Sequence, residues 1–141
     1  MECELPGPRP DLKTMKAIFD QVKTIAVVGL SPDESKASNM VARYLQNQGY
    51  RVIPVYPKEE TILGEKVYAS LAEIPEPIDM VDLFRKPDAM PAIAEAAAAR
   101  GDAKVFWMQQ GLASSAARKI AEAAGMTVVE GLCAKVEHQN L

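Results

Sequence analysis

The sequence predicts an α/β protein with a doubly wound, mainly parallel sheet and helices on both faces. Uncharged apolar segments alternate with segments of helical apolar spacing along the chain. Residues 24–28 are apolar on both faces of the expected strand, which is typical of a parallel sheet. A glycine ends each of three helical segments, at positions 49, 101 and 125. Ligands of such folds bind beyond the carboxyl ends of the strands, where the strand order reverses.

The first two helices and strands are indicated by caps and by apolar spacing. Asp11 is expected to cap a helix whose apolar positions are Leu12, Met15, Ile18 or Phe19, and Val22. A buried strand over 24–28 ends at Gly29. Ser38 is expected to cap the second helix, whose apolar stripe is Met40, Val41, Tyr44 and Leu45. The second strand is expected over 50–55.

The remaining elements continue the alternation. Residues 62–68 predict a turn and a short edge strand, and Ser70 with Glu73 matches a capping box for a short helix. Further strands are expected over 79–84, 104–108 and 126–129, and further helices over 91–100 and 114–124. Trp107 is interpreted as a core residue.

Length and charge restrict the classes of protein. The 141 residues fit one domain over 11–141, preceded by a loose, proline-containing lead-in over 1–10. No apolar run approaches the roughly 18 residues that cross a membrane. The start does not resemble a secretory signal, so we expect a cytoplasmic protein with Cys3 and Cys133 as free thiols. A net charge of −3 gives no general attraction to nucleic acid or to anionic membranes.

The segment from Gly29 to Ser38 joins a strand to a helix through a loop with glycine and serine. Free backbone N–H groups and the positive end of the helix dipole converge in such a loop. We therefore predict that a phosphate-bearing ligand binds over this segment.

The segments that follow the expected strands should share one rim of the sheet. They are 29–31, 56–58, 85–87, 109–111 and 131–133. Four of the sixteen basic residues belong to this region: Lys36, Lys58, Arg85 and Lys86. The grouping favours a ligand with several phosphates, and the alternative is that each is a solvated surface residue.

A nicotinamide dinucleotide fits this rim poorly. The G-x-G-x-x-G fingerprint is absent, because Gly29 is followed by Leu30, Ser31 and a proline. The acidic residue that binds a ribose 2′-hydroxyl is also absent, and the second strand runs instead into Tyr56 and Lys58. A phosphorylated ribose fits better.

Eight segments together carry a resemblance to a known family. They are Gly29–Ser31, Ser38 to Tyr50, Val52–Pro57, Leu63–Gly64, Tyr68–Leu71, Val81–Arg85, Trp107–Gln109, and Cys133 with Glu137–His138. Over about residues 18–138 the chain resembles the single-domain CoA-binding proteins and the N-terminal CoA-binding domain of the succinyl-CoA synthetase alpha subunit.

The resemblance implies coenzyme A as the ligand. Ser31, Ser38 and the Leu30 amide would hold the pyrophosphate, with Lys36 alongside. Residues 54–58 would flank the adenosine and its 3′-phosphate, and residues 83–85 would line the adenine or pantetheine side. The acids Asp33 and Glu34 depart from the family's more basic loop, and Gly131 and Leu132 replace its aspartate and arginine. The complete predicted site is Gly29, Leu30, Ser31, Lys36, Ser38, Pro54, Val55, Tyr56, Pro57, Lys58, Leu83, Phe84, Arg85, Lys86, Gln109 and Gly111.

Catalytic groups are not indicated by any pattern. The sequence has no G-x-S-x-G motif and no paired carboxylates on the rim. Cys133 has two interpretations, a buried small hydrophobe, which we favour, or a thiol beside a bound thiol. His138 is interpreted as a surface residue rather than a metal ligand.

The sequence thus predicts a protein that binds CoA or acyl-CoA without catalysis of its own. Two alternatives stay open. One is a nucleotide-dependent enzyme, using NAD or acting on acyl-CoA with a partner subunit. The other is an interaction module that has lost its ligand, in which the acidic loop residues would be unsurprising. A protein partner and self-association also stay open.

Overall fold

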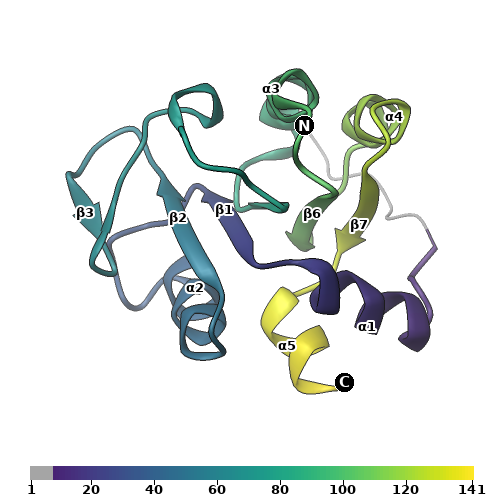
Figure 1. Ribbon diagram of the computed structural model, residues 1–141, viewed down its shortest axis with the longest axis horizontal. Helices are drawn as coiled ribbons and strands as arrows, with labels where there is room; N and C mark the ends of the chain where they lie inside the picture. Colours follow the sequence, from purple (N-terminus) through teal and green to yellow (C-terminus); the bar gives the residue numbers. More distant parts are fainter. Residues whose placement is uncertain (1–7) are drawn as a thin grey trace.

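The computed structural model describes residues 8–141 and contains a five-stranded sheet with helices on both faces (Figure 1). The strand order is β2-β1-β5-β6-β7, and all pairs are parallel. This confirms the predicted fold class. The strands are β1 (Thr24–Val28), β2 (Arg51–Val55), β3 (Thr61–Ile62), β4 (Glu65–Lys66), β5 (Met80–Leu83), β6 (Val105–Gln110) and β7 (Thr127–Gly131). The helices are α1 (Leu12–Gln21), α2 (Ala37–Asn47), α3 (Met90–Arg100), α4 (Ser115–Ala123) and α5 (Ala134–Gln139), with short 3-10 helices at η1 (Leu71–Glu73) and η2 (Pro87–Ala89).

The strand order reverses beside β1. The chain passes from β1 to β2 at one edge and then returns to β5 on the other side of β1. Val28, the last residue of β1, pairs with Val55 of β2 and with Leu83 of β5, so these three strands end level. The loops that follow them therefore meet at one switch point, where ligands bind in folds of this kind.

Two apolar cores lie on the two faces of the sheet. Ile25 and Val27 point to the core that α1, α2 and α5 cover, and Ala26 and Val28 point to the core that α3 and α4 cover (Figure 1). Alternate strand residues face opposite sides, so a strand buried on both faces needs this uninterrupted apolar run. Trp107 is fully buried, as predicted, and its indole N–H donates to the Leu132 carbonyl at 2.8 Å.

Two of the sequence-predicted caps form. The Asp11 carboxylate accepts a hydrogen bond from the Thr14 amide at 2.7 Å and begins α1. The capping box of Ser70 and Glu73 is complete and begins η1. Such caps satisfy amides that have no partner within the helix.

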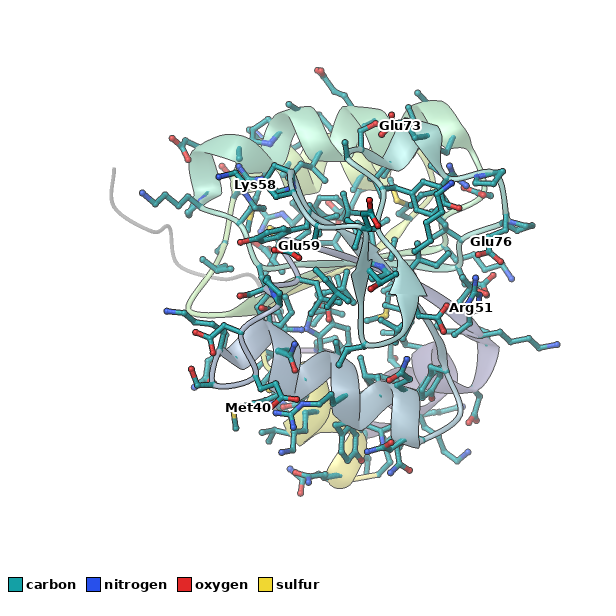
Figure 2. The ribbon with its side chains drawn as sticks, turned by 90° about the vertical axis from the view of Figure 1, so that its left-hand side faces the viewer. Met40, Arg51, Lys58, Glu59, Glu73 and Glu76 are labelled. Carbon is teal, nitrogen blue, oxygen red and sulfur yellow. The ribbon has the colours of Figure 1, made fainter. Side chains whose placement is uncertain are left out.

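The predicted cap at Ser38 is wrong. Helix α2 begins at Ala37, so Ser38 lies inside its first turn, and its hydroxyl oxygen accepts from the Ser31 amide at 3.0 Å. Met40 and Leu12, both predicted in apolar stripes, are 44% and 66% exposed. Figure 2 shows Met40 at the edge of the molecule. The buried face of each helix is the one that packs on the sheet. Met40 and Leu12 lie next to that face rather than on it.

The segment over 62–68 also differs from the prediction. Strands β3 and β4 pair with each other in a separate antiparallel hairpin instead of extending the main sheet. Only Tyr68 reaches the sheet, where it forms a parallel bridge with Val55. Strands of two residues are too short to pair along the whole edge of the sheet.

Helix α5 has no counterpart in the prediction. It has six residues and no side-chain cap, so local signals for it are weak. It packs against α1 and α2, and Arg9 from the lead-in pairs with Glu137 at 2.5 Å. Arg9 is therefore attached to the domain, whereas Cys3 and the rest of residues 1–7 lie outside the described part. Within residues 8–141, no helix is long and apolar enough to cross a membrane.

Candidate functional site

Gly29 brings the loop after β1 against the segment after β5. Its φ of +87° lies in the region that favours glycine. A Cβ at this position would lie 2.8 Å from the Phe84 carbonyl oxygen and 3.1 Å from Arg85 Cδ. The Gly29 amide donates to the Val55 carbonyl at 2.9 Å, so the loops after β1, β2 and β5 are fixed together here.

The predicted phosphate loop is held by its own chain. The Ser31 amide donates to Ser38, the Ser31 hydroxyl oxygen accepts from the Asp33 amide at 3.1 Å, and the Asn39 side-chain amide donates to the Ser31 carbonyl at 2.9 Å. Ser38 and Asn39 are buried. The two serines therefore fix the shape of the loop in this structure.

The acids of this loop are directed into local contacts or solvent. The Asp33 carboxylate accepts from the Ser35 amide and hydroxyl at 2.9 and 2.7 Å, and these hydrogen bonds lower the pKa of Asp33. Glu34 is exposed, and its carbonyl accepts from the Arg43 guanidinium at 2.9 Å. Lys36 is also exposed. None of the three lines a cavity of the described chain.

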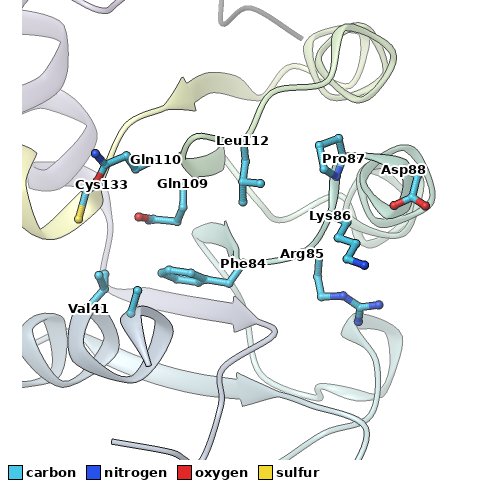
Figure 3. A pocket seen from close by; sticks show the side chains of 11 residues that line it. Val41, Phe84, Arg85, Lys86, Pro87, Asp88, Gln109, Gln110, Leu112 and Cys133 are labelled. Carbon is cyan, nitrogen blue, oxygen red and sulfur yellow. The ribbon is translucent and has the colours of Figure 1, made fainter. Parts of the chain in front are cut away.

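A cavity of about 720 Å³ lies at the switch point (Figure 3). Its size is in the range of small-molecule sites. Basic side chains line one end, and Val41 and Cys133 line the other. The full lining is Ala37, Val41, Phe84, Arg85, Lys86, Pro87, Asp88, Gln109, Gln110, Leu112 and Cys133.

A second cavity, of about 350 Å³, lies next to the first, and Arg85 lines both. Its wall is mainly apolar: Val28, Val55, Tyr56, Pro57, Ala69, Ser70, Leu71, Arg85, Ala89, Ala92, Ile93 and Ala96. Arg100 supports this wall, because its guanidinium donates to the Leu71 and Ile74 carbonyls at 2.7 and 2.8 Å. The Tyr56 ring and the alanines of α3 form a surface suited to a flat, largely apolar group.

Arg85 and Lys86 have charges that no described residue neutralises. Both side chains are exposed, and neither forms an ion pair or hydrogen bond with a residue of the described chain. By contrast, Arg51 pairs with both Glu65 and Glu76. Unpaired cations at a concave site favour an anionic ligand.

The predicted site residues fall into three groups. Those that line a cavity are Val55, Tyr56, Pro57, Phe84, Arg85, Lys86 and Gln109. Those that build the loops and strands without lining either cavity are Gly29, Leu30, Ser31, Ser38, Pro54, Leu83 and Gly111, of which Leu30, Ser38, Pro54 and Leu83 are buried. Lys36 and Lys58 are exposed beside the cavities, and Lys58 lies with Glu59 on the turn after β2 (Figure 2).

Gln109 and Gln110 belong to β6 rather than to the loop after it. The strand is longer than predicted because its pairing with β7 shifts between Trp107 and Gln110. Gln109 is buried, its amide nitrogen donates to Asp82 at 2.5 Å, and its oxygen accepts from the Ala134 amide at 3.3 Å. The side chain thus joins β5, β6 and the start of α5 at the wall of the larger cavity.

Asp82 is a fully buried carboxyl in β5. Burial raises its pKa to about 7, against the lowering effect of the Gln109 hydrogen bond. Its second oxygen, Oδ2, has no hydrogen-bond partner among the described residues. Its negative charge, when present, lies behind the wall of the cavity.

Cys133 and His138 both differ from their favoured interpretations, a buried small hydrophobe and a surface residue. Cys133 is half-buried and lines the larger cavity, because the start of α5 turns it toward the switch point. His138 is packed in an aromatic cluster rather than free at the surface: its ring lies 5.2, 5.4 and 5.8 Å from the rings of Phe19, Tyr44 and Tyr50. Its Nδ1 lies 2.6 Å from the Tyr44 hydroxyl.

Several lining residues are absent from the predicted site. The sequence places Val41 in a helix stripe, Ile93 in an expected helix, and Ala69 and Leu71 in a segment that carries the family resemblance, and it gives Leu112 no role. Apolar lining residues have the same sequence pattern as core residues, so only their packing distinguishes them.

These features define a parallel α/β binding fold with a partly basic cavity at the switch point. The chain belongs to the CoA binding domain family, which matches residues 23–139. The chain is 43% identical over 129 residues to the uncharacterized protein YneT of Bacillus subtilis, covering 95% of that protein. It is also 36% identical over 73 residues to an ADP-forming acetate–CoA ligase of Archaeoglobus fulgidus, of which it covers 11%.

Solved structures of similar length share the whole fold. A hypothetical protein from Pyrococcus horikoshii matches with a TM-score of 0.91 at 39% identity, covering 100% of this chain and 99% of that one. A Thermus thermophilus protein matches with a TM-score of 0.87 at 37% identity, covering 93% and 98%. The likeness therefore extends over the sheet and both helical layers.

Proposed function

We propose that this chain binds coenzyme A, free or acylated, at the switch point and carries out no reaction of its own. The observation that carries the proposal is the position of Arg85, an unpaired cation between a larger cavity and a smaller apolar one. CoA has the matching parts, with phosphates between an adenine and a pantetheine arm. Membership of the CoA binding domain family supports the same ligand.

The two cavities suggest an orientation. The smaller cavity, with Tyr56 and Pro57, suits the adenosine. Lys58 directly follows Pro57 in the chain and would contact the 3′-phosphate. Arg85 and Lys86, together with the amides of the Gly29 to Ser38 loop, would hold the pyrophosphate. The pantetheine arm then extends along the larger cavity toward Cys133.

Absence of a chemical step is part of the proposal. Cys133 is the nucleophilic side chain on the wall of the larger cavity, and no histidine lines that wall within the described chain. The single histidine, His138, contacts Tyr44 instead. A CoA carrier or sensor fits these groups better than an acyl-transfer enzyme, which needs an activated nucleophile.

Calorimetric titration with CoA and with 3′-dephospho-CoA tests the proposal. Arg85→Ala should weaken CoA binding by about 1 to 3 kcal/mol, roughly 5- to 150-fold, because a charge-assisted contact is lost. Lys119→Ala, which removes an exposed cation from α4, is the control and should leave binding unchanged. Lys58→Ala should lower affinity for CoA and leave affinity for 3′-dephospho-CoA unchanged. Equal affinities of wild type and Arg85→Ala would contradict the proposal.

Thermal unfolding distinguishes CoA from other nucleotides. Only a ligand that binds the native state raises the midpoint temperature, so CoA should raise it and NAD or NADP should not. A shift with NAD alone would support the alternative of an oxidoreductase. No shift with any nucleotide would support an interaction module.

A further inference from the structure

The larger cavity differs in chemistry between its two ends. Arg85, Lys86 and Asp88 carry the charges at one end, and Phe84 lies between that end and the one formed by Val41 and Cys133 (Figure 3). At the Val41–Cys133 end the lining is apolar or neutral. The proposed orientation of CoA places the end of the pantetheine arm here.

No cation of the described chain lines the Val41–Cys133 end. Lys135, two residues beyond Cys133, has its ammonium over the Tyr44 ring at 5.8 Å from the centroid. Arg43, two residues beyond Val41, binds the Glu34 carbonyl. A carboxylate placed at this end would lose its hydration without gaining an ion pair, which is costly.

The polar side chains that line this end are the neutral amides of Gln109 and Gln110 (Figure 3). Both ends of the Gln109 amide are used, one by Asp82 and one by the Ala134 amide. One Gln109 N–H is thus bonded to Asp82, and neither glutamine carries a positive charge that could pair with a carboxylate. Asp82 behind it is an acid, so any charge there would repel an anionic group.

We propose that the Val41–Cys133 end of the cavity is an acyl subsite that accepts short uncharged acyl thioesters of CoA and rejects dicarboxylic ones. The proposal rests on the proposed binding of CoA and specifies which acyl forms the site takes. Apolar side chains gain from burying methylene groups, each of which strengthens binding by up to about fourfold. A terminal carboxylate reverses this gain, since no positive group compensates its burial.

Butyryl-CoA and succinyl-CoA form a matched pair for calorimetry, because both acyl groups have four carbons and only one ends in a carboxylate. Butyryl-CoA should bind at least as tightly as CoA, and succinyl-CoA at least tenfold more weakly than butyryl-CoA. Equal or tighter binding of succinyl-CoA would overturn the acyl subsite while leaving CoA binding intact. Failure of CoA itself to bind would overturn both proposals.

A charge introduced at this end should reverse the preference. Cys133→Lys puts a cation on a half-buried wall position, so succinyl-CoA should gain at least tenfold relative to butyryl-CoA. Val136→Lys adds the same charge at an exposed position of α5 outside the cavity and should change neither affinity. An unchanged ratio in a folded Cys133→Lys protein would contradict the subsite. If Cys133→Lys does not fold, the affinities of the wild-type protein for butyryl-CoA and succinyl-CoA still test the acyl subsite.

Discussion

The loops after β1 and β5 lie side by side and differ in how their polar groups are used. In the loop from Gly29 to Ser38, the two serines bind their own chain, and the acids face solvent or cap a turn. In the segment from Phe84 to Asp88, two cations remain without partners and line the larger cavity. The sequence favours the first loop as the phosphate site, but in the structure it is the cations of the second segment that line the cavity. The side chains of the loop after β1 thus mainly hold the loop itself, whereas the segment after β5 directs its two cations to the cavity in which we propose that the ligand binds.

The largest expected effect tests the contact between these two loops. Gly29→Ala adds a Cβ against the Phe84 carbonyl at a left-handed φ, so we expect a loss of about 3 kcal/mol or more in the free energy of unfolding. Urea denaturation measures this loss. Gly49→Ala is the control, because its φ of +97° is similar and a Cβ there meets nothing within 4 Å. It should cost about 1 to 2 kcal/mol. Equal losses in the two variants would show that the close approach is unimportant.

A second test concerns the buried acid at the base of the β5 segment. The pKa of Asp82 is raised to about 7 when folded, above its ordinary value of 3.8. Between pH 3.8 and pH 7, Asp82 is protonated in the folded protein and ionised in the unfolded chain. The free energy of unfolding therefore falls as the pH rises through this range. We expect this carboxyl to cost about 2 kcal/mol between pH 5 and pH 8.

The Asp82→Asn variant isolates that effect. Asparagine keeps an oxygen for Gln109 and does not titrate, so its stability relative to wild type should rise by about 2 kcal/mol from pH 5 to pH 8. Urea unfolding at several pH values gives the difference. Asp88→Asn makes the same chemical change at an exposed position and serves as the control. If the free energies of unfolding of wild type and Asp82→Asn changed in parallel with pH, Asp82 would not have a raised pKa in the folded protein.

A third test compares one lysine from each loop. Lys86 lines the cavity and Lys36 does not, so Lys86→Ala should weaken CoA binding by about five- to tenfold and Lys36→Ala by less than twofold. Calorimetry at one fixed salt concentration measures both. A larger loss of affinity in Lys36→Ala than in Lys86→Ala would indicate that the loop after β1 makes the phosphate contact.

The smallest expected effect tests whether Ser38 stabilises the loop or contacts the ligand. Ser38→Ala leaves the Ser31 amide without its acceptor, and we expect a loss of about 1 kcal/mol in stability. CoA affinity should change by less than threefold, since Ser38 is buried against its own loop. A tenfold loss of affinity with unchanged stability would identify Ser38 as a direct ligand contact.

Local patterns were sufficient for most of the fold. The apolar run over 24–28, the Asp11 cap and the capping box at Ser70 act over a few residues, and all three appear as predicted. Ser38 was misassigned because a serine before an apolar stripe predicts a cap, and its contact with Ser31 is visible only when the loop is folded. Helix α5 was missed because its stability comes from contacts with α1 and α2 rather than from its own sequence.

The sequence by itself determined the alternation of strands and helices and the rim on which Arg85 and Lys86 lie, because both follow from residue spacing and strand direction. Only the tertiary structure decided which rim residues line a cavity, where Cys133 points, and that His138 is packed among aromatic rings. Those properties depend on contacts between residues as distant in the chain as Tyr44 and His138. Such contacts arise from the packing of whole elements, which no local pattern encodes.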